Sequence, residues 1–133
     1  MSNHLFVYGT LKSGLAPTDI SLIVKKLKPL AKATVRGILY DLGHFPGAIL
    51  DPDSERTISG LVLELPDDPD ALVQLDRYEE FDPETPATSQ FLRVRTSVLL
   101  ETGCDAECWI YIYNRDPGTA PILEDGVFPK RNS

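Results

Sequence analysis

The sequence predicts an α+β fold, built from a mixed, mostly antiparallel, barrel-like sheet with two or more short flanking helices. Two observations lead to this prediction. Five or six segments have strand character and two have helical spacing, without the strict alternation of parallel α/β proteins. Short turns join consecutive strand-like segments, which favours antiparallel pairing. At 133 residues, the chain matches the usual size of a single domain with its own hydrophobic core.

The first half of the chain contains most of the expected strands. Leu5-Phe6-Val7-Tyr8 is a short apolar run that Gly9 ends, which predicts a buried first strand followed by a turn. Residues 19–28 carry apolar side chains on one helical face and lysines on the other, so we expect a helix that Pro29 stops. Further strands are expected at residues 33–42, where Gly37 suggests a bulge or close packing, and at residues 48–50 and 58–65.

The second half begins with a helix and continues with a hairpin. Pro69 stands at the first position of a helix that we expect to run to about Glu79. Residues 82–89 are rich in proline and threonine and should form a loop. The remaining expectations are strands at 91–101 and 106–113, a turn at 102–105, and a loosely held tail from about residue 114.

Charge and composition indicate which kinds of partner and which cellular location to expect. The net charge of −7 repels nucleic-acid phosphates and anionic membranes, so neither is expected as a partner. Neither a membrane-spanning run of roughly 20 apolar residues nor a secretory leader is recognisable, which makes a cytoplasmic location the default expectation. The two histidines are far in sequence from Cys104 and Cys108, so no metal site is expected and both thiols should be reduced. The sequence does not determine the oligomeric state.

The first candidate for chemistry is the segment Tyr8-Gly9-Thr10-Leu11. A strand that ends in glycine can turn its next amides outward, and successive outward N–H groups bind a carboxylate or a developing oxyanion. The alternative is a plain turn after the strand, with the Tyr8 side chain in the core. This segment alone favours the plain turn, because a single glycine after a strand is common.

The second candidate is the acidic end of the second helix. With about 100° per residue, Glu79 falls roughly 20° from Leu72, inside the apolar stripe, whereas Glu80 falls at its edge or outside. Burial would raise the pKa of the Glu79 carboxyl and suit it to general acid and base work. We expect Asp76, Glu80 and Asp82 to be solvated. The alternative for Glu79 is also a solvated position in the last helical turn.

The strand pair of the hairpin supplies further polar residues. Arg93 follows Phe91 at an alternate position, so the two share a face of their strand, and Tyr111 and Tyr113 likewise share a face. At least one of these tyrosines should lie in the core. Arg93 could pair with a carboxylate of the site or could cap the sheet edge in solvent.

Taken in order, these segments resemble the γ-glutamylcyclotransferase-like superfamily, in particular its AIG2-like, γ-glutamylamine cyclotransferase-type branch. The resemblance covers roughly residues 5 to 113. Its opening motif and the ordered set of segments are fairly specific, whereas each later piece alone is weak. The matching pieces are Phe6 to Gly14 as "VYGTL…G", Gly37 to Gly43 with Phe45-Pro46-Gly47, Gly60-Leu61-Val62, Leu75 to Glu79, Phe91-Leu92-Arg93 and Ala106 to Tyr113.

The resemblance implies a mixed barrel with flanking helices and an enzyme that cyclises a γ-glutamyl group to 5-oxoproline, releasing an amine or amino acid. The expected partner is a small-molecule γ-glutamyl substrate, and the reaction would need no metal or cofactor. The catalytic role falls on Glu79. The expected substrate-binding residues, acting through their backbone, are Tyr8, Gly9, Thr10 and Leu11, and further candidate pocket residues are Tyr40, Arg93 and Tyr113.

One departure from the family pattern leaves a second hypothesis open. Many members have glycine after the catalytic glutamate, and this chain has Glu80. A second acid beside Glu79 could raise its pKa, alter the pocket or make it ambiguous which acid acts. The alternative is therefore a binding or regulatory module that keeps the small-molecule pocket without turnover.

Overall fold

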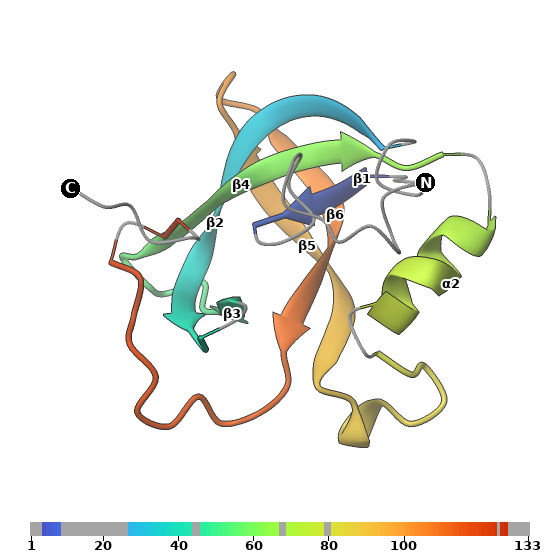
Figure 1. The fold of residues 1–133 in the computed structure, drawn as a ribbon. Coiled ribbons are helices and arrows are strands. Elements are labelled where there is room, and N and C mark those ends of the chain that lie inside the picture. Colours follow the sequence, from blue (N-terminus) through green and yellow to red (C-terminus); the bar gives the residue numbers. More distant parts are fainter. Residues whose placement is uncertain are drawn as a thin grey trace.

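The computed structural model describes residues 4–8, 27–43, 46–66, 69–78, 81–124 and 126–127. Its described elements are β1 (His4–Val7), β2 (Lys28–Asp41), β3 (Pro46–Leu50), β4 (Thr57–Glu64), helix α2 (Pro69–Tyr78), the 3-10 helix η2 (Pro86–Thr88), β5 (Phe91–Leu100) and β6 (Asp105–Tyr113). The strands form one sheet in the order β3-β2-β4-β1-β6-β5, and a further pairing between β2 and β5 closes five of them into a barrel (Figure 1).

The pairings confirm the expected α+β fold with a mixed, mostly antiparallel barrel. β1 runs antiparallel to β4 and parallel to β6, and every other described pairing is antiparallel. β3 pairs only with β2 and lies outside the closed ring. Helix α2 lies beside the barrel, against the side formed by β1, β5 and β6 (Figure 1).

Within the described residues, each expected strand and the second helix has an observed counterpart, and the largest difference in bounds is at the start of β2. This strand begins at Lys28, earlier than expected, so Lys28 is not the end of a helix. The rest of the helix expected at 19–28 lies outside the described residues, apart from the buried Leu27. Pro29 is accommodated because the register between β2 and β4 shifts between Pro29 and Ala31, where the missing proline N–H interrupts the ladder.

The apolar side chains divide into two clusters on opposite faces of the barrel wall. The alternation along β1 shows this directly: Phe6 and Tyr8 belong to the inner cluster, and Leu5 and Val7 to the outer one. The outer cluster includes Leu75 of α2, which is fully buried. Burial of this outer cluster is therefore what fixes the helix against the barrel.

Gly37 is where β3 packs closely on β2. A Cβ atom at this position would lie 2.5 Å from the carbonyl oxygen of Ile49, which is too close for any side chain. The suggestion of close packing at Gly37 is thus confirmed. Glycine here lets β3 approach β2, and further along the same ladder Gly47 pairs with Tyr40.

The described segment 114–124 after β6 is attached to the barrel, whereas we expected a loosely held tail from about residue 114. Ile122 forms a bridge with Tyr40, and the Leu123 N–H donates to the Leu39 carbonyl at 2.8 Å. The Leu123 side chain is buried in the inner cluster. Pro117, Gly118 and Pro121 lie within the described segment that leads from β6 to Leu123.

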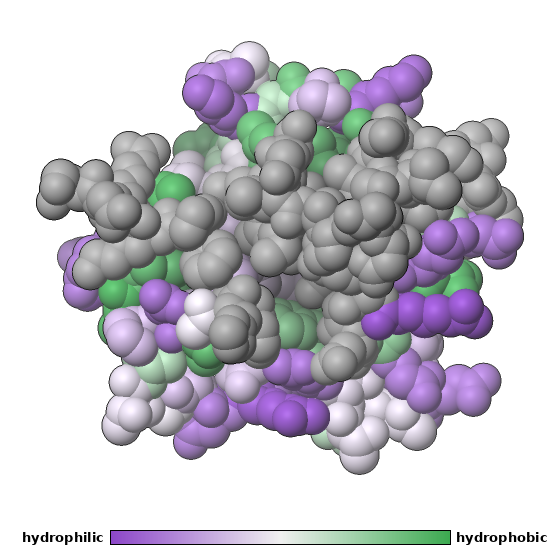
Figure 2. Space-filling model, in the orientation of Figure 1, coloured by the Kyte–Doolittle hydropathy of each residue, from purple (hydrophilic) through white to green (hydrophobic). Residues whose placement is uncertain are grey.

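The described surface is strongly polar in the view of Figure 2, where hydrophilic residues occupy much of its margin and hydrophobic ones appear between them. This agrees with a chain in which 25% of residues are charged. Within the part of the chain that the structure describes, no helix is long and apolar enough to cross a membrane.

Candidate active site

The last turn of α2 carries a buried carboxylate, Asp76, which is only 5% exposed. The Arg93 Nε donates to its Oδ1 at 2.8 Å, and the Arg93 Nη2 donates to its Oδ2 at 3.3 Å. The Tyr111 hydroxyl donates to the same Oδ1 at 2.6 Å. Our expectation that Asp76 is solvated is therefore wrong. The helical wheel places Asp76 beside the apolar stripe, and charge-assisted bonds from the facing strands make its burial tolerable.

The two donors to Asp76 are side by side because of the register of the hairpin. Arg93 of β5 pairs directly with Tyr111 of β6, and directly opposed residues share a face. Tyr111 is 4% exposed, which confirms that one of the two tyrosines lies in the core. The pairing of Arg93 with a carboxylate is also confirmed, and its partner is Asp76.

Arg93 also contacts the chain that follows the helix. Its guanidinium carbon lies 6.0 Å from the centre of the Phe81 ring and 4.3 Å from that of Trp109. The Phe81 N–H donates to the main-chain carbonyl of Asp76 at 2.8 Å. One guanidinium thus binds the side chain of Asp76 and lies over the ring of Phe81, five positions later in the chain.

The end of β1 is tied to the same group of residues. The Tyr8 hydroxyl donates to the main-chain carbonyl of Tyr111. The Tyr8 side chain is buried in the inner cluster, as the plain-turn alternative expected, while the role of its backbone stays a prediction. The remaining residues of both candidate segments, Gly9, Thr10, Leu11, Glu79 and Glu80, lie outside the described residues.

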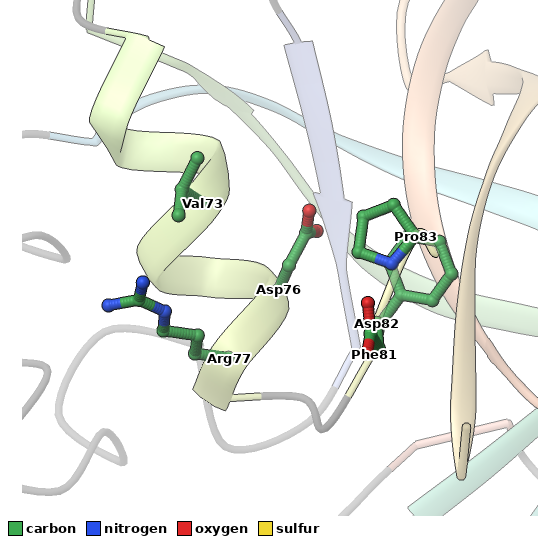
Figure 3. Close-up of a pocket in the computed structure, with 6 residues that line it drawn as sticks. All are labelled: Val73, Asp76, Arg77, Phe81, Asp82 and Pro83. Atoms are coloured by element: carbon green, nitrogen blue, oxygen red, sulfur yellow. The ribbon is translucent and has the colours of Figure 1, made fainter. Parts of the chain in front are cut away.

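An open pocket of about 510 Å³ lies at the end of α2. Figure 3 shows Asp76 pointing from the helix toward the segment after it. Asp82 is exposed, as expected for a solvated acid, and its Oδ2 accepts a bond from the Thr85 hydroxyl at 3.0 Å. The described residues that line the pocket are Val73, Asp76, Arg77, Phe81, Asp82 and Pro83.

Two further candidate pocket residues, Tyr40 and Tyr113, meet at β3 and do not line the described part of this pocket. Tyr40 pairs with Gly47, and a Cβ atom on Gly47 would lie 3.0 Å from the Tyr113 ring. Tyr113 also packs edge-on against Phe91, with 5.5 Å between ring centres. Their part in a substrate pocket stays a prediction.

Sequence reasoning did not assign roles to Asp76, Tyr111 and Trp109. A usable signal was present, because Arg93 and Tyr111 alternate with apolar residues on strands that form a hairpin. What could not be read was the register of that hairpin, together with the helix face that covers it.

Comparisons with known proteins agree with this architecture. The crystal structure of a mouse AIG2-like protein is 23% identical, with 92% of this chain and 86% of the mouse chain covered and a TM-score of 0.70. The crystal structure of YkqA from Bacillus subtilis is 22% identical, with a TM-score of 0.68. The match covers 96% of this chain but only 39% of the YkqA chain, so this chain spans less than half of that protein. A solved gamma-glutamyl cyclotransferase is 15% identical, with 92% and 70% covered and a TM-score of 0.61. At these identities the likeness shows the fold.

A search among curated proteins found no match to the chain. The model of the family described as "Gamma-glutamyl cyclotransferase, AIG2-like" matches residues 5–130, which is nearly the whole chain. This match indicates an enzyme of the cyclotransferase type. By its sequence and by its barrel, the chain belongs to the AIG2-like gamma-glutamyl cyclotransferase family.

Proposed function

We propose that this protein cyclises the γ-glutamyl group of a small molecule to 5-oxoproline and releases an amine or an amino acid. Family membership supports the reaction type. The observation that carries the proposal is the bonded connection from Tyr8 through Tyr111 to Asp76. It links the end of β1, which precedes residues 9–11, to the last turn of α2, which precedes Glu79.

The proposed reaction is an intramolecular aminolysis. The α-amino nitrogen of the substrate attacks the γ-carbonyl carbon and forms the lactam C–N bond, and the bond from that carbon to the departing nitrogen breaks. Glu79 accepts the proton that the attacking amine loses and returns it to the departing nitrogen. One carboxyl group therefore serves as base and then as acid, and no water, metal or cofactor is consumed.

The backbone of Tyr8 to Leu11 provides the second part of the proposed site. Its amide groups bind the substrate carboxylate or the oxyanion that develops on the γ-carbonyl oxygen. The described neighbourhood suits such a loop, because Tyr8 is held by its hydroxyl and by the inner cluster. A loop anchored at its start presents its amides with little reorganisation.

The decisive experiment compares Glu79→Gln with Glu80→Gln. Purified protein is incubated with a panel of γ-glutamyl amines and γ-glutamyl dipeptides, and 5-oxoproline release is measured by chromatography. We expect Glu79→Gln to lower kcat on the order of 100-fold or more, because the proton relay is lost, and Glu80→Gln to retain most activity. Circular dichroism checks that both variants fold. Full activity in Glu79→Gln would contradict the assignment.

The Glu80 departure favours a second candidate function, a binding or regulatory module without turnover. The same panel distinguishes it, because a binding module is stabilised thermally by a γ-glutamyl compound without forming any product. If Glu80→Gly, which restores the common family residue, gains activity that the natural chain lacks, the second candidate is supported.

A further inference from the structure

Asp76 anchors both ends of the short chain segment that follows it. Its carboxylate is bonded to β5 through Arg93 and to β6 through Tyr111. Its main-chain carbonyl accepts the N–H of Phe81 at 2.8 Å. The chain that leaves Asp76 thus returns to the same residue five positions later, and Glu79 lies within this interval of the sequence.

Arg93, on β5, contacts the same two residues, Asp76 and Phe81, through its side chain. Its planar fork makes two bonds to the Asp76 carboxylate, and its guanidinium carbon lies over the rings of Trp109 and, at a longer distance, Phe81. A lysine would keep the charge but would lose both the paired bonds and the stacking. Arg93 can therefore be tested for geometry separately from charge.

The energetics point to positioning as the reason for this cluster. Removing two charges from water carries a large desolvation cost for each ion, and a buried ion pair is often no more stable than packed apolar side chains. Every buried side-chain nitrogen and oxygen of the described residues has a hydrogen-bond partner, so the cluster is fully satisfied. The arrangement of α2 on the hairpin, in which all of these groups are paired, therefore explains the cluster better than net stability does.

We propose that Asp76, Arg93 and Tyr111 are positioning residues that fix Asp76 and Phe81, which stand on either side of Glu79 in the sequence, relative to the end of β1. The proposal rests on the proposed function, in which Glu79 moves the proton. Tyr111 joins the two sides, because its hydroxyl donates to Asp76 and its carbonyl accepts the Tyr8 hydroxyl. In this proposal, these residues act through the position of Glu79 and not on the reacting atoms themselves.

The test compares Arg93→Lys with the matched control Arg95→Lys. Arg95 lies two positions along β5, also stacks on Trp109 at 4.9 Å, and pairs with the exposed Glu107. Kinetics are measured well below each variant's melting temperature, so that loss of folded protein does not contribute. We expect Arg93→Lys to lower kcat on the order of 10- to 100-fold, with KM changed less than about twofold because substrate binding is untouched. Arg95→Lys should match the natural protein.

Hydrogen–deuterium exchange provides a readout that does not depend on turnover. We expect Arg93→Lys to speed exchange of the Phe81 amide about tenfold through local opening, with the amides of β4 unchanged. Tyr111→Phe, which keeps the ring and removes one donor, should act in the same direction more weakly. It also serves as the test if Arg93→Lys does not fold.

The outcomes separate this proposal from the proposed function. Unchanged exchange at Phe81 overturns the positioning role whether or not the protein is active. Faster exchange with unchanged kcat in an active protein also overturns it, because the segment would then loosen without consequence. If the natural chain releases no 5-oxoproline, the proposed function fails, and faster exchange confined to residues 77–82 still supports the anchoring by Asp76 and Arg93.

Discussion

The environments of Cys104 and Cys108 differ although the two residues are four positions apart. Cys104 is exposed in the turn before β6, and Cys108 is completely buried inside the barrel. Burial raises the pKa of the Cys108 thiol from 9.0 to about 11, with a smaller contribution from the neighbouring Glu107 charge. Both thiols are free, as the sequence led us to expect.

Alkylation should therefore distinguish the two thiols. At pH 8, iodoacetamide should modify one cysteine of the folded protein quickly, because only the thiolate reacts and Cys108 is both inaccessible and protonated. Mass spectrometry counts the adducts. Cys104→Ser should remove the fast adduct, and denaturant should expose the second. Two rapid adducts on the folded protein would contradict the burial of Cys108.

At the scale of elements, the described segment after β6 packs beside the end of β2 and adds Leu123 to the inner cluster. Leu123 is 5% exposed and packs with Leu39 and Ile58 among others. Its neighbour Glu124 forms an ion pair with Arg56 on the surface, where the two side chains are 74% and 39% exposed. Apolar burial, and not the visible ion pair, should attach this segment.

Two adjacent substitutions test that comparison. Leu123→Ala should lower the free energy of unfolding by about 3 kcal/mol, because it leaves a cavity in the inner cluster. Glu124→Gln should lower it by less than about 1 kcal/mol, because water and salt screen an exposed pair. Urea titration followed by circular dichroism measures both. Equal losses of unfolding free energy would contradict this expectation, because the ion pair would then contribute as much as the buried leucine.

At the scale of the whole molecule, the two apolar clusters share their strands. β1 contributes Phe6 and Tyr8 to the inner cluster and Leu5 and Val7 to the outer one, and β6 likewise contributes Ile110 and Tyr111. Neither cluster can be lost without breaking strands that the other needs. The described part of the chain is thereby expected to unfold as one unit, as small single domains usually do.

This expectation is checked with two probes. Trp109 is the only tryptophan and packs against the outer cluster, so its fluorescence follows that cluster. Far-ultraviolet circular dichroism follows the whole barrel. We expect the two guanidinium unfolding curves to superimpose, with the same midpoint and slope. An earlier fluorescence transition would mean that α2 and its cluster detach before the barrel opens.

Much of the fold was determined by the sequence itself. Alternation of apolar residues located the strands within a few residues, Pro69 marked the start of α2, and Gly37 marked a close approach of two strands. These signals are local, because each depends on backbone geometry within a few residues. The early start of β2 and the docking of Leu123 were not predicted, since both depend on partners distant in the chain.

For the site, the sequence determined the family resemblance, whereas its assignment of Glu79 and of the segment from Tyr8 to Leu11 stays a prediction. Only the tertiary structure decided that Asp76 is buried, because a helical wheel gives the direction of a side chain but not what it faces. The register that sets Arg93 beside Tyr111, and the helix that places Asp76 on both, bring together residues 17 and 35 positions apart. The pairing of Asp76 with Arg93 and Tyr111 therefore exists only in the assembled barrel, where the helix and the two strands come together.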